Sequence, residues 1–393
     1  MTTISASPST VELTPADVFS IRADFPIVDL EMNGRPLVYL DSGATSQKPR
    51  SVIDVERQYY ERENAAVHRG AHTLAALATE RFEHARATLA HFVGTQNDEI
   101  VATEMEHHAN LLPWQELASR SGAVLRHIPI SDDGNMRMDE AARIITPRTR
   151  VLAFTHVSNV LGVINPVAEL VALAHAVGAL VVLDACQSAP HLPLDVVALG
   201  VDFAAFSGHK MLGPTGVGVL YGRRELLNAL PPFLTGGSMI STVTMEGAKY
   251  LPVPQRFEAG TGPVSQAIAL ATAVDYLDRV GIERIARHEA SLGQRLVVGL
   301  SDIPGVTVLG PEAGRPRVGL ASFDVDGVHS HDIGQFLDVR GIAVRVGHHC
   351  AQPLHRRLGA NSSTRASTYL YTTDDEIDEF LDAVSAATKF FRG

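Results

Sequence analysis

The stretch Phe203-Ala-Ala-Phe-Ser-Gly-His-Lys210 decides the fold of this 393-residue chain. Its apolar first half predicts a buried strand, and its second half, which ends in His209 and Lys210, predicts a polar turn where that strand stops. Ligands of open α/β sheets bind at such strand ends. A lysine there, beside a histidine and the hydroxyl of Ser207, could carry an imine to a carbonyl cofactor. For an arbitrary lysine a surface position in a turn is commoner, so the surrounding sequence has to separate the two interpretations.

Length and composition limit the possible functions. A chain of 393 residues is too long for one ordinary core, which predicts two domains. A net charge of −11 without a basic tract argues against a nucleic-acid surface, and no apolar run approaches the roughly 20 residues of a membrane span. The N-terminus has no secretory pattern. The two cysteines, Cys186 and Cys350, cannot form a structural zinc site alone, so we expect no metal and a cytoplasmic location.

Strands and helices alternate from residue 100 onward. Apolar segments predict strands at 100–103, 123–129, 150–155, 180–184, 203–207 and 216–221. Periodic segments between them predict helices at 109–121, 138–146, 166–176 and near 194–199. Strands that are apolar throughout are typical of a parallel sheet covered by helices on both faces. The sequence therefore predicts an α/β fold built from right-handed βαβ units.

The segments on either side of this alternation predict additional parts. Residues 14–30 resemble a short helix followed by an arm, with helices expected at 50–63 and 73–93. Residues 231–262 form a long Gly- and Pro-rich excursion, a kind of segment that is usually functional. Beyond it we expect helices at 264–280, 282–301, 331–340 and 374–391, and strands near 305–309, 319–324 and 342–346. The predicted organisation is an arm over 1–35, a large domain over 36–280 and a small α+β domain over 281–393, against which the arm packs.

Polar residues follow four of the predicted strands. They are contributed by the segments 103–110, 155–159, 184–187 and 207–210. Four such groups at one edge of one sheet are a strong signal of a site. Together they supply the residue types of pyridoxal phosphate (PLP) chemistry: a lysine for the imine, an acid for the pyridinium nitrogen, a ring to stack on the cofactor, and donors for the phosphate.

Motifs spread from about Asp24 to the C-terminus carry a family resemblance. They are Leu40-Asp-Ser-Gly-Ala44, Ala66-Val-His-Arg-Gly70, Glu106-His-His-Ala-Asn110, Thr155-His-Val-Ser-Asn-Val-Leu-Gly162, Phe206-Ser-Gly-His-Lys-Met-Leu-Gly-Pro-Thr-Gly216, Gly236-Gly-Ser-Met-Ile240, Arg345-Val-Gly-His-His-Cys-Ala351 and Thr364-Arg-Ala-Ser367. In these motifs the chain resembles group II (Suf-type) cysteine desulfurases, class V aminotransferase-like enzymes of PLP fold type I. The resemblance implies a large PLP-binding domain whose mostly parallel sheet is of the seven-stranded type.

The resemblance also implies roles in cofactor binding. Lys210 would hold PLP as an imine, Asp184 would face the pyridine nitrogen, and Gln187 would face the phenolic oxygen. His107 would stack on the ring and move protons, and Asn159 would lie near the cofactor oxygen and the substrate carboxylate. The phosphate would be bound by Ser207, His209 and, from the other subunit of a homodimer, Thr261.

For the substrate, the resemblance implies L-cysteine as the reactant. Arg365 would clamp its carboxylate, and His68 and Arg69 would line the entrance. Cys350 would attack the substrate sulfur, leaving alanine and a persulfide for iron–sulfur cluster assembly. The persulfide would then pass to an acceptor protein of the SufE or SufU type.

The residues around Cys350 agree with that role. Arg345, His348 and His349 precede it closely, and cationic or donor groups nearby favour a thiolate. An inert buried cysteine is the commoner outcome for a random position, but a Gly-His-His-Cys loop argues against it. Cys186 is expected to be a small packing residue instead.

One departure from the family lies between Gly94 and Val101. About 25 to 30 residues are absent there, roughly one αβ unit, including a turn that would form much of the phosphate site. Either the sequence runs straight across an omitted, disordered stretch, or the protein lacks the unit. We expect the first, because a true deletion would remove half of the phosphate site while every other catalytic residue stayed.

Other functions compete with the desulfurase hypothesis. A selenocysteine lyase shares the fold and most of the site, and would depend less on Cys350. Another class V enzyme, such as a transaminase, an epimerase or a kynureninase, is disfavoured by the Gly-His-His-Cys loop. A cofactor-poor, non-catalytic homologue is conceivable if the segment before Val101 is truly deleted.

Overall fold

The computed structural model describes residues 15–32, 34–36, 47–65, 72–81 and 98–392. The chain divides into two compact units, 1–96 and 97–393, and each is described by itself. His68 and Arg69 lie outside the described residues. So does the stretch 82–97, which includes most of the segment before Val101.

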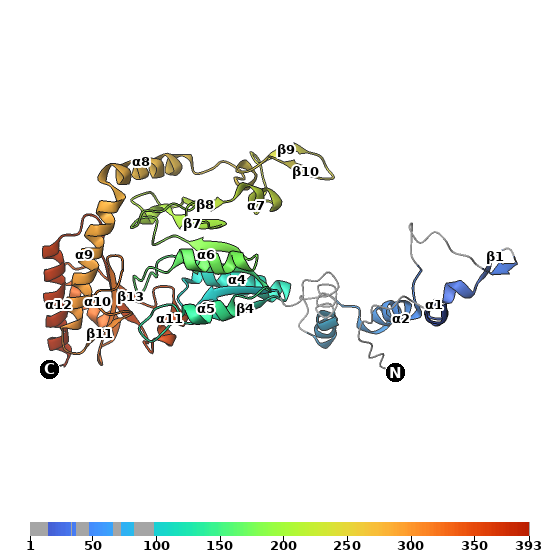
Figure 1. Ribbon diagram of the computed structural model, residues 1–393, viewed down its shortest axis with the longest axis horizontal. Coiled ribbons are helices and arrows are strands. Elements are labelled where there is room, and N and C mark those ends of the chain that lie inside the picture. The colour runs from blue at the N-terminus through green and yellow to red at the C-terminus, as the bar shows by residue number, and fades with distance from the viewer. Residues whose placement is uncertain (1–14, 33, 37–46, 66–71, 82–97, 393) are drawn as a thin grey trace. The chain divides into compact units, whose positions relative to one another are not determined.

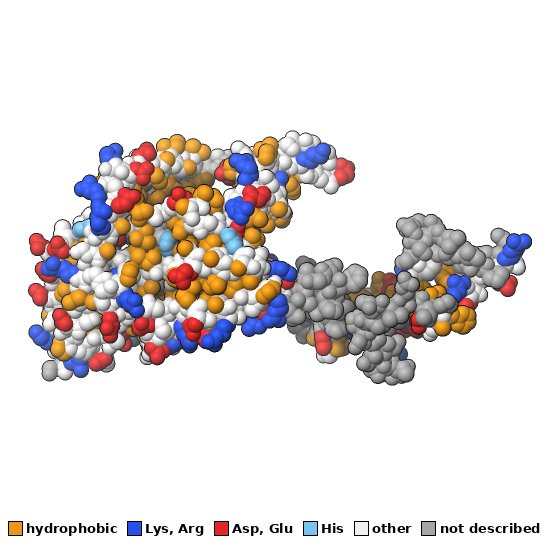
Figure 2. Space-filling view, in the orientation of Figure 1, with side chains coloured by type: hydrophobic (Ala, Val, Ile, Leu, Met, Phe, Trp, Pro, Cys, Tyr) orange, Lys and Arg blue, Asp and Glu red, His pale blue; other side chains and the backbone are white. Residues whose placement is uncertain are grey.

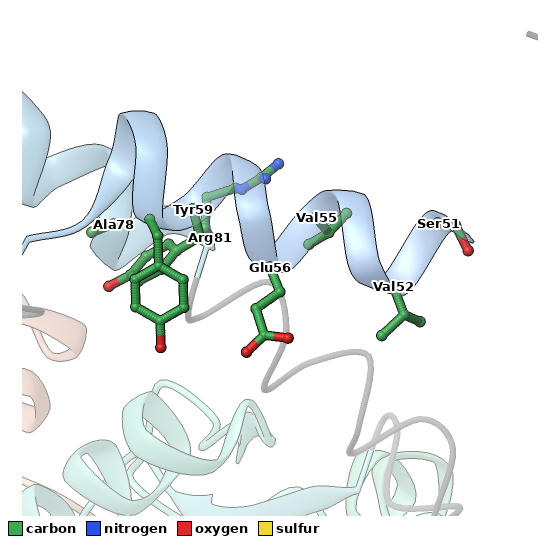
Figure 3. Close-up of a pocket in the computed structure, with 8 residues that line it drawn as sticks. Ser51, Val52, Val55, Glu56, Tyr59, Ala78 and Arg81 are labelled. Carbon is green, nitrogen blue, oxygen red and sulfur yellow. The ribbon is translucent and has the colours of Figure 1, made fainter. Parts of the chain in front are cut away.

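The first unit consists of short elements. Its helices are α1 (Pro15–Arg22), the 3₁₀ turn η1 (Pro26–Asp29), and α2 (Arg50–Gln58), which continues as a π-helical turn, η2 (Tyr59–Glu63). The two-residue strands β1 (Glu31–Met32) and β2 (Arg35–Pro36) pair antiparallel, and residues 73–81 are helical. One face of α2 and the helix at 73–81 line a pocket of about 720 Å³, whose residues include Val52, Val55, Tyr59, Ala78 and Arg81 (Figure 3). The short helix predicted within 14–30 is present as α1, and the helix predicted at 50–63 is present as α2 and its π-helical continuation. Of the helix predicted at 73–93, residues 73–81 are helical and the rest lies outside the described residues.

The second unit contains a six-stranded sheet in its described residues. Its strands are β3 (Glu99–Thr103), β4 (Val124–Ile128), β5 (Thr149–Thr155), β6 (Leu180–Asp184), β7 (Phe203–Ser207) and β8 (Gly218–Gly222). Their order is β4-β3-β5-β6-β7-β8, and all neighbours are parallel except β7 and β8. The predicted α/β fold with a mostly parallel sheet is confirmed. The described residues hold six strands where the seven-stranded type was expected.

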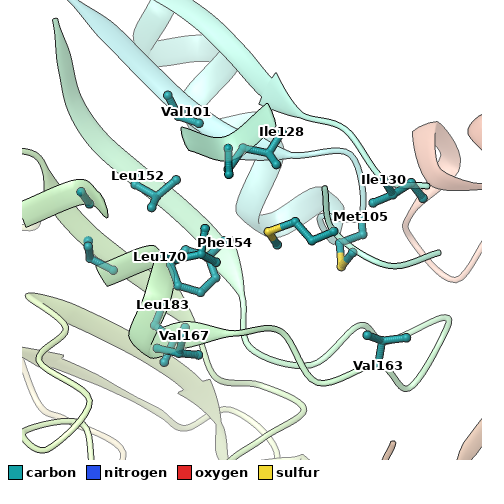
Figure 4. Packing of buried hydrophobic residues seen from close by; sticks show 14 of the residues in the cluster. Val101, Met105, Ile128, Ile130, Leu152, Phe154, Val163, Val167, Leu170 and Leu183 are labelled. Carbon is teal, nitrogen blue, oxygen red and sulfur yellow. The ribbon is translucent and has the colours of Figure 1, made fainter. Parts of the chain in front are cut away.

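Helices pack on this sheet because its central strands β3, β5 and β6 are rich in apolar residues and largely buried. They are α4 (His108–Ser121), α5 (Met138–Ile144) and α6 (Val167–Ala176) (Figure 1). Leu152, Phe154, Leu170 and Leu183 are fully buried in the resulting core (Figure 4). Burial of a side chain of this size stabilises the fold by about 1.5–3 kcal/mol.

The prediction of a helix near residues 194–199 is wrong. These residues form turns, in which the Asp195 carboxylate accepts from the backbone N–H groups of Val197 and Ala198 at 3.0 and 2.9 Å. Gly200 follows with a left-handed backbone, at φ 74°. A side chain that caps the first turn and a left-handed glycine five residues later leave no room for a regular helix.

A four-stranded antiparallel sheet forms the C-terminal part. Its order is β11 (Val306–Leu309), β12 (Leu320–Val325), β14 (Ser363–Ser367) and β13 (Arg345–Gly347). Three helices share a buried core with it: α9 (Ile282–Ser301), α10 (Ser330–Asp338) and α12 (Asp374–Arg392) (Figure 1). The short helix α11 (Gln352–Arg357) precedes β14. The sequence analysis did not predict β14, because its five residues are polar or small and show no alternation.

The remaining elements connect the two sheets. After the 3₁₀ turn η3 (Gly208–Lys210) come α7 (Arg224–Ala229), the hairpin of β9 (Ile240–Val243) and β10 (Ala248–Tyr250), and the turn η4 (Gln255–Phe257). Helix α8 (Val264–Val280) then leads through Gly281 to α9, at the predicted boundary between the large and small domains, which stays a prediction. None of the helices in the described residues has the length and apolar character needed to cross a membrane.

Candidate active site

The parallel strands bring the predicted polar groups to one edge of the large sheet. Thr155 at the end of β5 is in register with Asp184 at the end of β6, and Asp184 is in register with Ala205 of β7. The charges of Asp184 and Lys210 both act on the imidazole of His107, so the three side chains are neighbours. The structure therefore gathers the lysine, the acid and the ring that the sequence analysis assigned to one site.

His107 is held as the N-terminal cap of α4. Its Nδ1 accepts a hydrogen bond from the backbone N–H of Ala109 at 3.1 Å. Burial, with the charge of Lys210 second, lowers the pKa of His107. A neutral ring whose Nδ1 accepts must carry its proton on Nε2. Nε2 is thus the atom of His107 that is left for a ligand.

Asp184 is fixed by the backbone of the turn that follows it. The Cys186 N–H donates to the Asp184 carboxylate at 2.9 Å, and the Cys186 sulfur lies 3.6 Å from the Ser207 hydroxyl. Burial raises the pKa of the Cys186 thiol, which agrees with the packing role expected for it. Gln187 is half-buried in the same turn.

The Lys210 turn closes on itself through close backbone contacts. The N–H groups of Met211 and Gly213 both donate to the Gly208 carbonyl at 3.0 Å. A Cβ atom at Gly213 would lie 2.8 Å from that carbonyl oxygen, so a glycine is needed there. Lys210 is half-buried and His209 exposed. Thr261 is exposed between η4 and α8, with no hydrogen bond to these groups among the described residues.

Cys350 lies on a strained loop after β13, the cysteine loop, residues 348–351. His349 and Cys350 both have left-handed backbones, at φ 52° and 59°. Each such residue costs of order 1–3 kcal/mol unless its surroundings hold it. The His108 N–H donates to the Cys350 carbonyl at 2.7 Å, and Asn159 Nδ2 donates to the His349 carbonyl at 2.7 Å. The start of α4 and the turn that follows β5 therefore anchor the loop at the edge where the other site residues lie.

Two arginines complete the surroundings of the thiol. Arg345 Nη2 lies 3.5 Å from the Cys350 sulfur, and Arg365 Nη1 donates to the Asn159 carbonyl at 2.8 Å. Burial, with Arg345 second, lowers the pKa of Arg365 to about 10. Its Nε atom is buried and has no hydrogen-bond partner among the described residues. An unpaired guanidinium N–H at this place fits an anionic ligand, as a carboxylate-bearing substrate would supply.

Glu106 is a buried residue to which the sequence analysis gave no role. Its carboxyl group accepts from Asn110 Nδ2 at 2.6 Å and from the Thr155 N–H at 3.1 Å, and it is bonded to the Thr103 hydroxyl. Burial raises its pKa to about 8, so the group is mostly protonated at neutral pH. The sequence offers one signal for a role of Glu106, which is its position beside His107. Its hydrogen-bond partner Thr155 is 49 residues away in the chain, so this contact could not be predicted.

Comparisons with known proteins agree with this geometry. The family model described as "Aminotransferase class-V" matches residues 38–101 and 94–380. The "Probable cysteine desulfurase 2" of Mycobacterium leprae is 52% identical over 416 residues, covering 97% of this chain and 99% of the relative. The "Cysteine desulfurase" of Haloferax volcanii is 42% identical, with coverage of 97% and 99%.

Solved structures are similar as well. The apo structure of a cysteine desulfurase from Thermococcus onnurineus NA1 is 38% identical with a TM-score of 0.72, covering 98% of this chain and 100% of that one. The cysteine desulfurase CsdA from Escherichia coli is 34% identical with a TM-score of 0.70, covering 97% and 100%. A C-DES structure with glycine linked covalently to its PLP cofactor is 26% identical with a TM-score of 0.64, covering 87% and 94%.

The comparisons also bear on the segment before Val101. The two matched parts of the family model meet at 94–101. The alignment with the M. leprae relative has 416 positions against 393 residues in this chain, which leaves at least 23 positions without a counterpart here. This relative therefore has aligned positions that this chain lacks, and the break in the family model lies where the sequence analysis located the gap.

Proposed function

The chain belongs to the class-V aminotransferase family, among the cysteine desulfurases, and from that premise we propose that it is a PLP-dependent cysteine desulfurase. It converts L-cysteine to L-alanine and leaves the sulfur as a persulfide on Cys350. One observation carries this proposal. The cysteine loop is hydrogen-bonded to the strand-end edge that holds His107, Asp184 and Lys210, and its thiol faces an arginine at 3.5 Å.

The residues at the sheet edge suit PLP. Lys210 would hold the cofactor, Asp184 would keep its ring nitrogen protonated, and His107 would cover the ring. Gln187, Ser207, His209, Asn159 and the partner-facing Thr261 would bind its oxygens and phosphate. When bound, PLP supplies an electron sink for the substrate carbons.

Arg365 and Asn159 are suited to the substrate carboxylate. The Arg365 Nε–H has no partner among the described residues, so it can donate a second hydrogen bond in addition to the one that Nη1 donates to the Asn159 carbonyl. A guanidinium group binds a carboxylate through two parallel hydrogen bonds. His68 and Arg69 stay predicted entrance residues, because they lie outside the described part of the chain.

The sulfur transfer needs no oxidant. The Cys350 thiolate attacks the substrate sulfur, an S–S bond forms, and the C–S bond breaks with its electron pair left on the carbon skeleton. That skeleton takes up protons and leaves as alanine, while the enzyme keeps a persulfide. Arg345 stabilises the attacking thiolate, and His107 Nε2 is a group that can hold or give up a proton at the site.

Several finer features belong to the same proposal. The exposed apolar side chains Val264 and Ile268 of α8 support a homodimer in which Thr261 reaches the partner's phosphate. The persulfide would pass to an acceptor of the SufE or SufU type for iron–sulfur cluster assembly. Both cysteines are free thiols, as expected of a cytoplasmic protein.

The test is alanine formation from L-cysteine by the purified protein with added PLP, with and without each type of acceptor. We expect a visible cofactor absorbance band and alanine formation, both lost in Lys210→Ala. Selenocysteine is run in parallel with the Cys350→Ala variant. If the protein is a selenocysteine lyase, the Cys350→Ala variant would keep the wild-type rate on selenocysteine. The wild-type protein, with Cys350 present, would be nearly inactive on cysteine. A protein that develops no band and makes no alanine would be the cofactor-poor homologue.

A further inference from the structure

We propose that Ser363 is a positioning residue for Cys350, acting through two buried histidines, His349 and His355. The inference rests on the proposed function, in which Cys350 accepts sulfur. Its basis is a chain of hydrogen bonds from α11, through β14, to the residue that precedes the thiol.

The geometry of this chain is compact. The Ser363 hydroxyl lies 2.9 Å from His349 Nε2 and 2.9 Å from His355 Nε2. His355 Nδ1 lies 3.0 Å from the Ala351 carbonyl, at the end of the cysteine loop. Ser363 and His355 are fully buried, and His349 is 2% exposed. In the folded protein these groups hydrogen-bond to one another, and water cannot reach them to serve as a partner instead.

The positions of the protons follow from what each group can do. A carbonyl only accepts, so His355 Nδ1 must donate to Ala351. In the neutral ring His355 Nε2 then has no proton and accepts the one proton of the Ser363 hydroxyl. Because that proton is already used, the Ser363 oxygen can only accept a hydrogen bond from His349, and His349 must donate it from Nε2. The Ala351 carbonyl therefore sets the tautomer of His355, and the Ser363 hydroxyl transmits that constraint to His349.

Burial keeps both rings neutral, as this chain requires. Burial is the largest cause that lowers the pKa of His349, to about 3, and Arg365, His355 and Arg345 act in the same direction. Burial also lowers the pKa of His355, with His348 adding to it and the Ala351 carbonyl opposing. The chain therefore stays in one protonation state throughout the neutral pH range.

The consequence for Cys350 comes through the backbone. His349 is left-handed, at φ 52°, and is held at two points: its ring by Ser363 and its carbonyl by Asn159. The following residue, Cys350, is left-handed as well. Without the serine hydroxyl the His349 ring loses its acceptor, and the backbone is free to relax to an ordinary conformation that moves the thiol.

The variant to test is Ser363→Ala, with Ser363→Thr as the conservative variant. Ser362→Ala is the matched control, because it removes the neighbouring hydroxyl, which is bonded to Ser330 at 2.8 Å and not to a histidine. Two quantities are measured on the holoenzyme: kcat and KM for alanine formation, and the rate at which iodoacetamide alkylates Cys350, followed by mass spectrometry.

We expect Ser363→Ala to lower kcat by about 10- to 100-fold with little change in KM, since displacement of a reacting group has effects of this size. The alkylation rate of Cys350 changes in the same variant. Ser363→Thr restores both quantities, and Ser362→Ala leaves them at the wild-type values. Wild-type kcat and alkylation in Ser363→Ala would overturn the inference. Full alanine formation by Cys350→Ala would instead overturn the proposed function, so the two failures are distinct.

A measurement on the wild-type protein avoids any effect of the variants on folding. Histidine-selective ¹⁵N labelling reports the tautomer of each ring, and the His349 and His355 signals are assigned by their loss in single variants. We expect a neutral His349 protonated on Nε2 and a neutral His355 protonated on Nδ1. The opposite tautomer at either ring, or a charged ring at neutral pH, would contradict the proton positions derived from this chain of hydrogen bonds.

Discussion

Glu106 links three parts of the site. Its carboxyl group joins the end of β3 through Thr103, the first turn of α4 through Asn110, and the end of β5 through Thr155. It directly precedes His107, so the position of that ring depends on it. A carboxyl group buried in this way is held in its neutral form by the loss of hydration.

Glu106→Gln should therefore change how stability depends on pH. The pKa of Glu106 in the folded protein is about 8, above its ordinary value of 4.5. The stability that the neutral group contributes is present below pH 4.5 and is lost as the pH rises toward 8. Each pH unit in that window costs the wild type up to about 1.4 kcal/mol.

The measurement is the unfolding temperature of both proteins at several pH values from 5 to 9. The wild type should lose stability relative to Glu106→Gln as the pH rises. Parallel curves for the two proteins would show that folding does not raise the pKa of Glu106.

Among single residues, the sequence predicted those that lie in strong motifs. It missed those whose roles depend on partners far away in the chain. His107, Asp184 and Lys210 could be brought together because each follows a strand of one parallel sheet. Glu106, Ser363 and His355 could not be assigned, since their roles come from hydrogen bonds between separate elements. The individual roles in binding stay predictions.

Among the elements, the turn after β7 determines where Lys210 stands. Gly213 returns to within hydrogen-bond distance of the Gly208 carbonyl, and Leu270 of α8 packs against both glycines. A side chain at Gly213 would meet the Gly208 carbonyl oxygen at 2.8 Å and Leu270 Cδ1 at 2.7 Å. The turn and α8 are therefore packed too closely to accept even a methyl group without a shift.

Gly213→Ala should weaken both the fold and cofactor binding. Overpacking at such a site costs about 1–3 kcal/mol, and the displaced turn carries Lys210, the proposed cofactor lysine. The unfolding temperature and the PLP affinity, followed by absorbance, should both fall. Gly247→Ala is the control, because nothing lies within 4 Å of an added Cβ there. Equal PLP affinity in the two variants would contradict the role assigned to the turn.

Prediction of the elements depended on how apolar each one is. Strands β6 and β7 have the predicted bounds because their apolar runs end sharply at Asp184 and Ser207. The polar strand β14, which carries Arg365, has no such signal and pairs with β12 and β13 through its backbone. The type of an element could therefore be predicted from the sequence where the burial of that element requires apolar residues.

On the scale of the second unit, an apolar hollow lies between the large sheet and α8. It has a volume of about 1110 Å³, and Met211, Val217 and Leu270 are among the residues that line it. Hydrophobic side chains are gathered on α8 and beside it (Figure 2). Val264 and Ile268 of α8 are 61% and 65% exposed. Apolar surface of this kind is typical of an interface between subunits.

Ile268→Asp should therefore convert a dimer to a monomer. A charge at this position would have to be buried against the second subunit, which is costly without a partner. The molar mass, measured by light scattering after size exclusion, should fall by half, and activity should fall with it if Thr261 binds the phosphate of the other subunit, as proposed. Val339→Asp, at the C-terminal cap of α10, is the control, because this position is 85% exposed and lies outside the hollow. A wild type that is monomeric and active would contradict the shared site.

The central claim is that Cys350 receives the sulfur of cysteine, and mass spectrometry of the protein after one turnover tests it most directly. The holoenzyme is mixed with L-cysteine without reductant or acceptor, quenched with an alkylating agent, and digested. We predict one additional sulfur atom on the Cys350 peptide and one alanine per modified site. Added sulfur on Cys186, or alanine formed while Cys350 stays unmodified, would contradict the account.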